Sequence, residues 1–190
     1  MGVTSFWRTT IGKKIVMAVT GVIMIVYLAG HLAGNLLVFA GPTRLDAYAA
    51  LLRSKPVLLW AARAILLGAV ALHVIAAYQL ARASRDARPD RYAKLTPRSA
   101  ILASRTMRVG GVAIAGFVIF HVLHLTTGTI EPVAFSQGHV YANVVGGFHI
   151  WWVATIYLIA LAAVGLHLYH GTWAWSRTLR VSRPSPDPLH

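Results

Sequence analysis

Histidine is the residue type that carries the most chemistry in this 190-residue chain, which has nine histidines, five acidic residues and no cysteine. An imidazole inside an apolar segment is costly unless its ring nitrogens find partners. Six of the histidines lie inside such segments: His31, His73, His121, His124, His167 and His170. A hydrogen bond between helices explains any one of them, but six, with at least one in each segment, favour a shared chemical role.

Depth along each apolar segment sorts these histidines into two layers. At a helical rise of about 1.5 Å per residue from the nearest flanking basic residue, an outer layer lies roughly 20–25 Å deep: His31, His121 and His124. An inner layer lies roughly 10–15 Å deep: His73, His167 and His170. A haem iron needs two axial ligands that face each other at one depth, so the layers predict two stacked b-type haems.

Depth alone does not choose the ligand within each close pair, and it slightly prefers His124 to His121 opposite His31. Small residues beside the ligands suit the approach of a flat porphyrin, with ordinary close packing of helices as the alternative: Gly30, Gly34, Gly68, Gly116 and Gly165. Three other histidines carry no functional prediction: His139, His149 and His190.

Composition indicates what positions these side chains. Hydrophobic residues make up 57% of the chain and charged residues 12%, about half the charge of a soluble domain. We therefore expect an all-α membrane protein, a transmembrane helical bundle in one membrane domain, residues 1–190. The absence of cysteine excludes disulfides, c-type haem attachment and iron–sulfur clusters within this chain.

Four segments are long and apolar enough to cross a bilayer, at approximately residues 15–40, 56–81, 108–130 and 148–175. Residues 82–107 form a basic loop, and residues 177–190 form a proline-rich tail. Between the last two spans, the segment from residue 132 to 147 is expected to be a loop or an interfacial helix.

The net charge of +13 is an orientation signal and not a nucleic-acid footprint. Fourteen of the 18 Lys and Arg residues flank the spans on one side. The positive-inside rule therefore places both termini and the basic loop in the cytoplasm.

In these features the chain resembles the cytochrome b558 family, the di-haem membrane subunit of succinate:menaquinone oxidoreductases (succinate dehydrogenase, of the tricarboxylic acid cycle). The resemblance rests on an ordered set of segments that covers nearly the whole chain: residues 10–21, 31–35, 104–107, 121–124, 144–148 and 165–173. The family normally has a fifth span after the fourth, which is not visible in this sequence.

The resemblance implies a distal haem held by His31 and His121 and a proximal haem held by His73 and His167, leaving His124 and His170 as alternates. It also implies a bacterial cytoplasmic membrane protein that is no enzyme by itself. Electrons would come from a flavoprotein through an iron–sulfur subunit and leave to a quinone, in this family menaquinone.

Two alternatives stay open at this point. One is a di-haem cytochrome b subunit of another quinone-linked complex, of the fumarate reductase or hydrogenase type. The other is a histidine-lined transporter, in which the imidazoles line one continuous path. Polar residues near the span ends are the candidates for a quinone site: Asp46, Tyr48, Arg63, His124 and Glu131.

Overall fold

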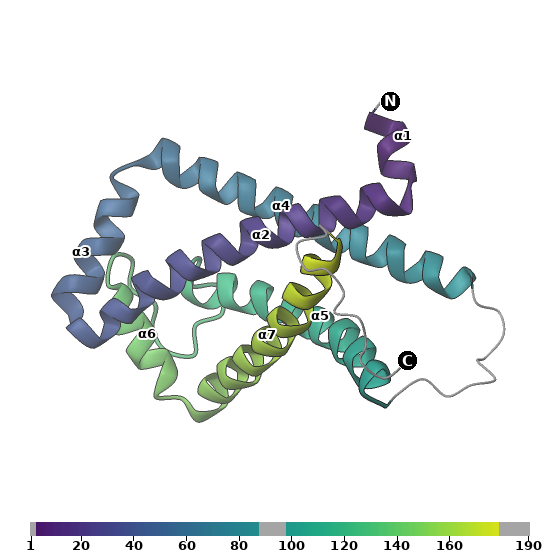
Figure 1. Ribbon diagram of the computed structural model, residues 1–190. Coiled ribbons are helices and arrows are strands. Elements are labelled where there is room, and N and C mark those ends of the chain that lie inside the picture. Colours follow the sequence, from purple (N-terminus) through teal and green to yellow (C-terminus); the bar gives the residue numbers. More distant parts are fainter. Residues whose placement is uncertain (1–2, 88–97, 179–190) are drawn as a thin grey trace. The chain divides into compact units, whose positions relative to one another are not determined.

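The computed structural model describes residues 3–87 and 98–178, and all of the regular elements within these ranges are helices (Figure 1). In chain order they are α1 (Val3–Arg8), α2 (Thr10–Asn35), the 3-10 helix η1 (Leu36–Ala40), α3 (Pro42–Arg53), α4 (Pro56–Asp86), α5 (Arg98–Leu125), α6 (Val140–Phe148) and α7 (Trp151–Thr178). The expected all-α class is confirmed for this part of the chain. Residues 88–97 of the predicted basic loop and 179–190 of the predicted tail lie outside it.

Four of the helical segments are long and apolar enough to cross a membrane: Thr10–Ala40, Pro56–Asp86, Thr106–Leu125 and Trp151–Thr172. Most of their large apolar side chains are exposed in the isolated chain, and several buried positions on them are alanine: Ala18, Ala69, Ala76 and Ala160. Small buried residues and apolar outer faces are typical of helices that pack within lipid. The four helices indicate a multi-pass membrane protein, as expected.

Helix α5 ends at Leu125, five residues before the expected end of the third span at residue 130. The Thr127 amide donates to the Val122 carbonyl, one residue further back than in an α-helix. Gly128 then adopts a positive φ of 67°, a conformation that glycine reaches without strain and that commonly ends helices.

Two other spans continue as helix beyond the expected ends, since α4 runs to Asp86 and α7 to Thr178. Because α5 begins at Arg98, the interhelical segment is shorter than the expected loop of residues 82–107. Arg and Lys end an apolar segment but are good helix formers. The membrane-crossing part and the helix therefore end at different residues.

The chain divides into two compact units. Unit 1 comprises residues 1–28, 62–96 and 169–190, and unit 2 comprises residues 29–61 and 97–168. In unit 2, α3 packs against both η1 and α6, and α6 also contacts α5 (Figure 1). Helix α6 confirms a helix in the segment before the fourth span, whereas α3 was not expected.

Two contacts fix the short helices of unit 2. An Asp46 carboxylate oxygen on α3 accepts a hydrogen bond from the Tyr141 amide in the first turn of α6, at 2.9 Å. This bond satisfies an amide that the helix itself leaves without a partner. Gly34 lies against the Tyr48 ring so closely that a Cβ at Gly34 would sit 2.7 Å from its Cε1 atom.

Candidate functional site

The rings of His31 and His121 lie together in unit 2. His31 is near the end of α2 and His121 is in the last two turns of α5, and their ring centroids are 5.7 Å apart at an interplanar angle of 88°. Metal–imidazole bonds of about 2 Å put the centroids of two rings that share one metal roughly 6 Å apart. The two histidines of the predicted distal pair therefore have nearly the spacing of axial ligands.

A hydroxyl group connects His121 to the alternate ligand His124. The Tyr157 hydroxyl of α7 lies 3.1 Å from Nδ1 of His121 and 3.1 Å from Nδ1 of His124. His124 is buried and stacks on Phe120, with centroids 5.4 Å apart. The two histidines that depth alone could not rank thus differ in surroundings, because the His31 ring contacts His121 whereas His124 is stacked within the protein.

Tyr157 belongs to this site although the sequence motifs did not indicate it. Its buried ring makes edge contacts with Phe117, Phe120 and Phe148, at centroid distances of 4.9, 6.1 and 4.7 Å. These contacts come from α5 and α6, and they fix the direction of the hydroxyl. The sequence signal for it was a tyrosine hydroxyl in the first half of the fourth span.

His73 in unit 1 is held in a different way. Its Nδ1 atom lies 3.1 Å from the Met17 carbonyl oxygen and 3.2 Å from the Thr20 hydroxyl, and that hydroxyl lies 2.7 Å from the Val16 carbonyl, to which it donates. Since a carbonyl only accepts, the Nδ1 atom of His73 carries the proton and its lone pair is on Nε2. A backbone carbonyl holds metal-ligating histidines in the same way.

Two of the inner-layer histidines, His73 and His167, each lie against a glycine. A Cβ at Gly21 would sit 3.7 Å from Cε1 of His73, and a Cβ at Gly111 would sit 3.7 Å from Cε1 of His167. Each glycine comes ten residues before an outer-layer histidine, His31 or His121. The same arrangement thus occurs twice, once within each unit, and the ten-residue spacing was a signal available in the sequence.

The structure does not test two of the predictions, which concern the proximal haem and His170. His73 belongs to unit 1 and His167 to unit 2, so their pairing at a proximal haem stays a prediction. The alternate His170 lies half-buried in α7 within unit 1, and its role as a ligand is likewise untested.

Four of the five glycines named beside the ligands are exposed, with open space next to them. A Cβ would meet no atom within 4 Å at four glycines: Gly30, Gly68, Gly116 and Gly165. Gly34 is the exception, because the Tyr48 ring occupies the place next to it. Among the described residues no group of three His, Asp or Glu side chains could hold a bare metal ion. Two imidazoles suit a metal whose other ligands come from a porphyrin, so the His31–His121 pair fits a haem.

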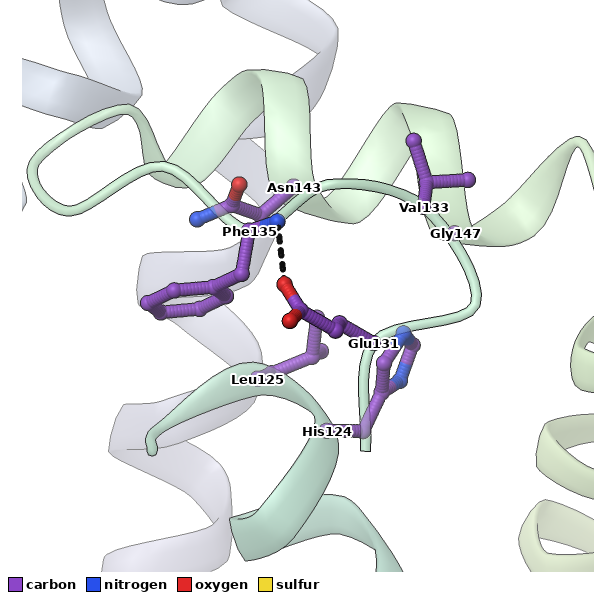
Figure 2. Close-up of a pocket in the computed structure, with 7 residues that line it drawn as sticks. All are labelled: His124, Leu125, Glu131, Val133, Phe135, Asn143 and Gly147. Carbon is purple, nitrogen blue, oxygen red and sulfur yellow. Dashed lines mark hydrogen bonds between the residues drawn. The ribbon is translucent and has the colours of Figure 1, made fainter. Parts of the chain in front are cut away.

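A small hollow beside His124 is lined by two of the candidate residues for a quinone site, His124 and Glu131. His124, Glu131 and Asn143 are among its lining residues (Figure 2), and it has room for about one water molecule. The Glu131 carboxylate accepts a hydrogen bond from the Phe135 amide at 3.1 Å. Of the other candidates, Asp46 and Tyr48 are engaged in the contacts of α3, and Arg63 lies in α4 within unit 1.

Comparison of the chain with family models, with curated proteins and with solved structures finds no match in any of the three.

Proposed function

We propose that this chain is the membrane-anchor and electron-transfer subunit of a succinate:quinone oxidoreductase. In this proposal His31 and His121 hold the distal haem, and His73 and His167 hold the proximal one. The observation that carries it is the His31–His121 pair, two imidazoles from different membrane-spanning helices at nearly axial-ligand spacing. The family resemblance supplies the substrate and the direction of electron flow.

The residues of the chain have three tasks in this function. The histidines bind and orient the cofactors, and each haem supplies a one-electron carrier when bound. The Met17 carbonyl orients His73 through Nδ1, and the Tyr157 hydroxyl contacts Nδ1 of His121. The apolar side chains of the spans keep water away from the histidines and anchor the chain in lipid.

The same proposal sets the partners and the location. The chain lies in a bacterial cytoplasmic membrane with both termini in the cytoplasm, where its many basic residues face a soluble iron–sulfur subunit that is itself reduced by a flavoprotein. The quinone, menaquinone in the family, is reduced near the distal pair. The chain by itself is therefore no enzyme, and its complex is the oxidoreductase.

The test is to purify the chain with its bound partners from a bacterial membrane and to measure haem per chain and the reduced-minus-oxidised spectrum. We expect two b-type haems per chain, reducible by succinate, together with a flavoprotein and an iron–sulfur protein. The matched control is the His139→Ala variant, because His139 is exposed at the start of α6. It should keep both haems.

Other results would overturn the proposal in distinguishable ways. A purified chain without a b-type spectrum would exclude both haem-based functions and leave the histidine-lined transporter. A di-haem chain that copurifies with a hydrogenase, or that succinate does not reduce, would point to the other quinone-linked complexes.

A further inference from the structure

The Tyr157 hydroxyl contacts two histidines at once, and it has a single proton. Both Nδ1 atoms lie 3.1 Å from it. A phenol hydroxyl donates one hydrogen bond and accepts others. When the hydroxyl proton also takes part, the hydroxyl donates to one of the two imidazoles and accepts from the other.

The other distributions of protons leave a buried polar atom without a hydrogen bond. If both Nδ1 atoms carry protons, both donate to Tyr157, and the rings packed against Tyr157 offer the phenol proton no lone pair: Phe117, Phe120 and Phe148. If neither carries one, the hydroxyl can satisfy only one of the two nitrogens. Leaving a buried donor or acceptor without a partner is costly, so the two histidines take opposite tautomers.

The surroundings decide which histidine takes which tautomer. The Nε2 atom of His124 faces α6, where a Cβ on Gly147 would lie only 2.8 Å from it, and this spacing leaves no room for a metal with its macrocycle. The His121 ring, in contrast, contacts the ring of His31. An unprotonated Nε2 atom can therefore bind a metal at His121, whereas at His124 there is no room for one.

We propose that Tyr157 is a positioning residue that holds His121 and His124 in opposite tautomers and so selects His121 as the ligand. His121 donates from Nδ1 to the Tyr157 oxygen, which leaves its Nε2 lone pair for a metal. The Tyr157 hydroxyl donates to Nδ1 of His124, whose proton is then on Nε2, beside the hollow that contains Glu131. The opposite tautomers follow from the hydrogen bonds alone, whereas the selection of a ligand rests on the proposed function.

The test is nuclear magnetic resonance of the full-length chain labelled with 15N at histidine, in detergent and with any haem reduced. Protonated and bare ring nitrogens have well-separated 15N shifts, and the His121→Ala and His124→Ala variants assign the signals. We expect a protonated Nδ1 on His121 and a protonated Nε2 on His124. The same tautomer on both residues would overturn the proposal, and so would the reverse assignment.

The Tyr157→Phe variant removes only the hydroxyl. We expect the signal of His124 to lose its single-tautomer shift, and the midpoint potential of the haem on His121 to change where haem is bound. Tyr169→Phe is the matched control, because Tyr169 is on the same helix and 73% exposed, and it should change neither. Unchanged signals in Tyr157→Phe would overturn the proposal. Where that variant does not fold, the tautomers of the unmodified chain decide.

The finding of opposite tautomers is independent of the proposed function, whereas the assignment of each tautomer to His121 or His124 rests on it. Opposite tautomers in a chain that never binds haem would exclude the function and keep the role of Tyr157 in setting the tautomers. Two haems in a chain whose His121 and His124 have the same tautomer would keep the proposed function and exclude this role of Tyr157.

Discussion

His73 and His121 lie in similar helical settings and differ in what holds the Nδ1 atom. In unit 1 the Nδ1 of His73 contacts a backbone carbonyl of Met17, whereas in unit 2 the Nδ1 of His121 contacts the hydroxyl of Tyr157. The carbonyl accepts only, so the proton of His73 stays on Nδ1. The hydroxyl accepts or donates, so the tautomer of His121 depends on what else the hydroxyl binds, which is His124.

Two imidazoles with the same predicted role can therefore differ in how firmly their tautomers are fixed. A histidine held by the backbone keeps its tautomer as long as the helix exists. A histidine held by a side chain keeps it only while a network of several residues is intact. Substitutions in unit 2 should therefore change the tautomers of its histidines. Comparable substitutions in unit 1 should leave the tautomer of His73 unchanged.

The largest effect is expected from Gly147→Ala. The new Cβ would lie 2.8 Å from Nε2 of His124, so the stacked ring must shift, and overpacking of this kind costs about 1–3 kcal/mol. The measurement is the thermal midpoint of the purified chain in detergent. Gly165→Ala is the control for the gain in helix propensity, because its Cβ would meet no atom within 4 Å.

A second substitution tests the cause of that effect. In the double variant Gly147→Ala with His124→Ala, the clashing ring is gone, and the two changes should be non-additive as in other contacting pairs. Additive changes in the midpoint would show that the His124 contact is not the cause. A Gly147→Ala variant as stable as Gly165→Ala would contradict the close packing itself.

A smaller effect is expected from Asp46→Ala, which removes the acceptor for the Tyr141 amide at the start of α6. Loss of such a cap costs about 0.5–2 kcal/mol. Hydrogen exchange of the α6 amides should become faster, while exchange around His73 stays the same. Asp46→Asn keeps an acceptor oxygen and should restore slow exchange. Equal exchange in Asp46→Ala and the unmodified chain would contradict the role of this bond.

The smallest effect is expected from Thr20→Val in unit 1. The substitution removes one acceptor near Nδ1 of His73 but leaves the Met17 carbonyl in place. Loss of one such hydrogen bond costs about 0.5–1.5 kcal/mol, and the retained carbonyl puts this case at the low end. The 15N signals should still show a protonated Nδ1 on His73. A change of tautomer would show that the carbonyl alone does not fix this ring.

The sequence predicts the spans well because length and apolar character are local properties. It missed the end of α5 because the turn after Leu125 depends on the bond from Thr127 to Val122 and on the positive φ of Gly128. It missed α3 because that helix has only 12 residues and carries charged side chains, whereas the spans were recognised by long uncharged apolar segments.

The candidate site was predictable in its residue types and not in its contacts. Six histidines in apolar segments and their depths are visible in the sequence, and these led to His31 opposite either His121 or His124. The choice of His121 came from the family resemblance. The role of Tyr157 was not visible, because it lies 36 residues from His121 and its contact depends on how α7 is rotated. Spans that are apolar on all sides carry little information about that rotation.

The most direct test of the central claim is the haem content of two variants of one pair. His121→Ala and His124→Ala are the same substitution on the same helix, three residues apart, and haem per chain is measured in each after purification. We predict that His121→Ala retains one haem and that His124→Ala retains two. Two haems in His121→Ala, or one haem in His124→Ala with two in His121→Ala, would contradict the assignment of the distal ligand.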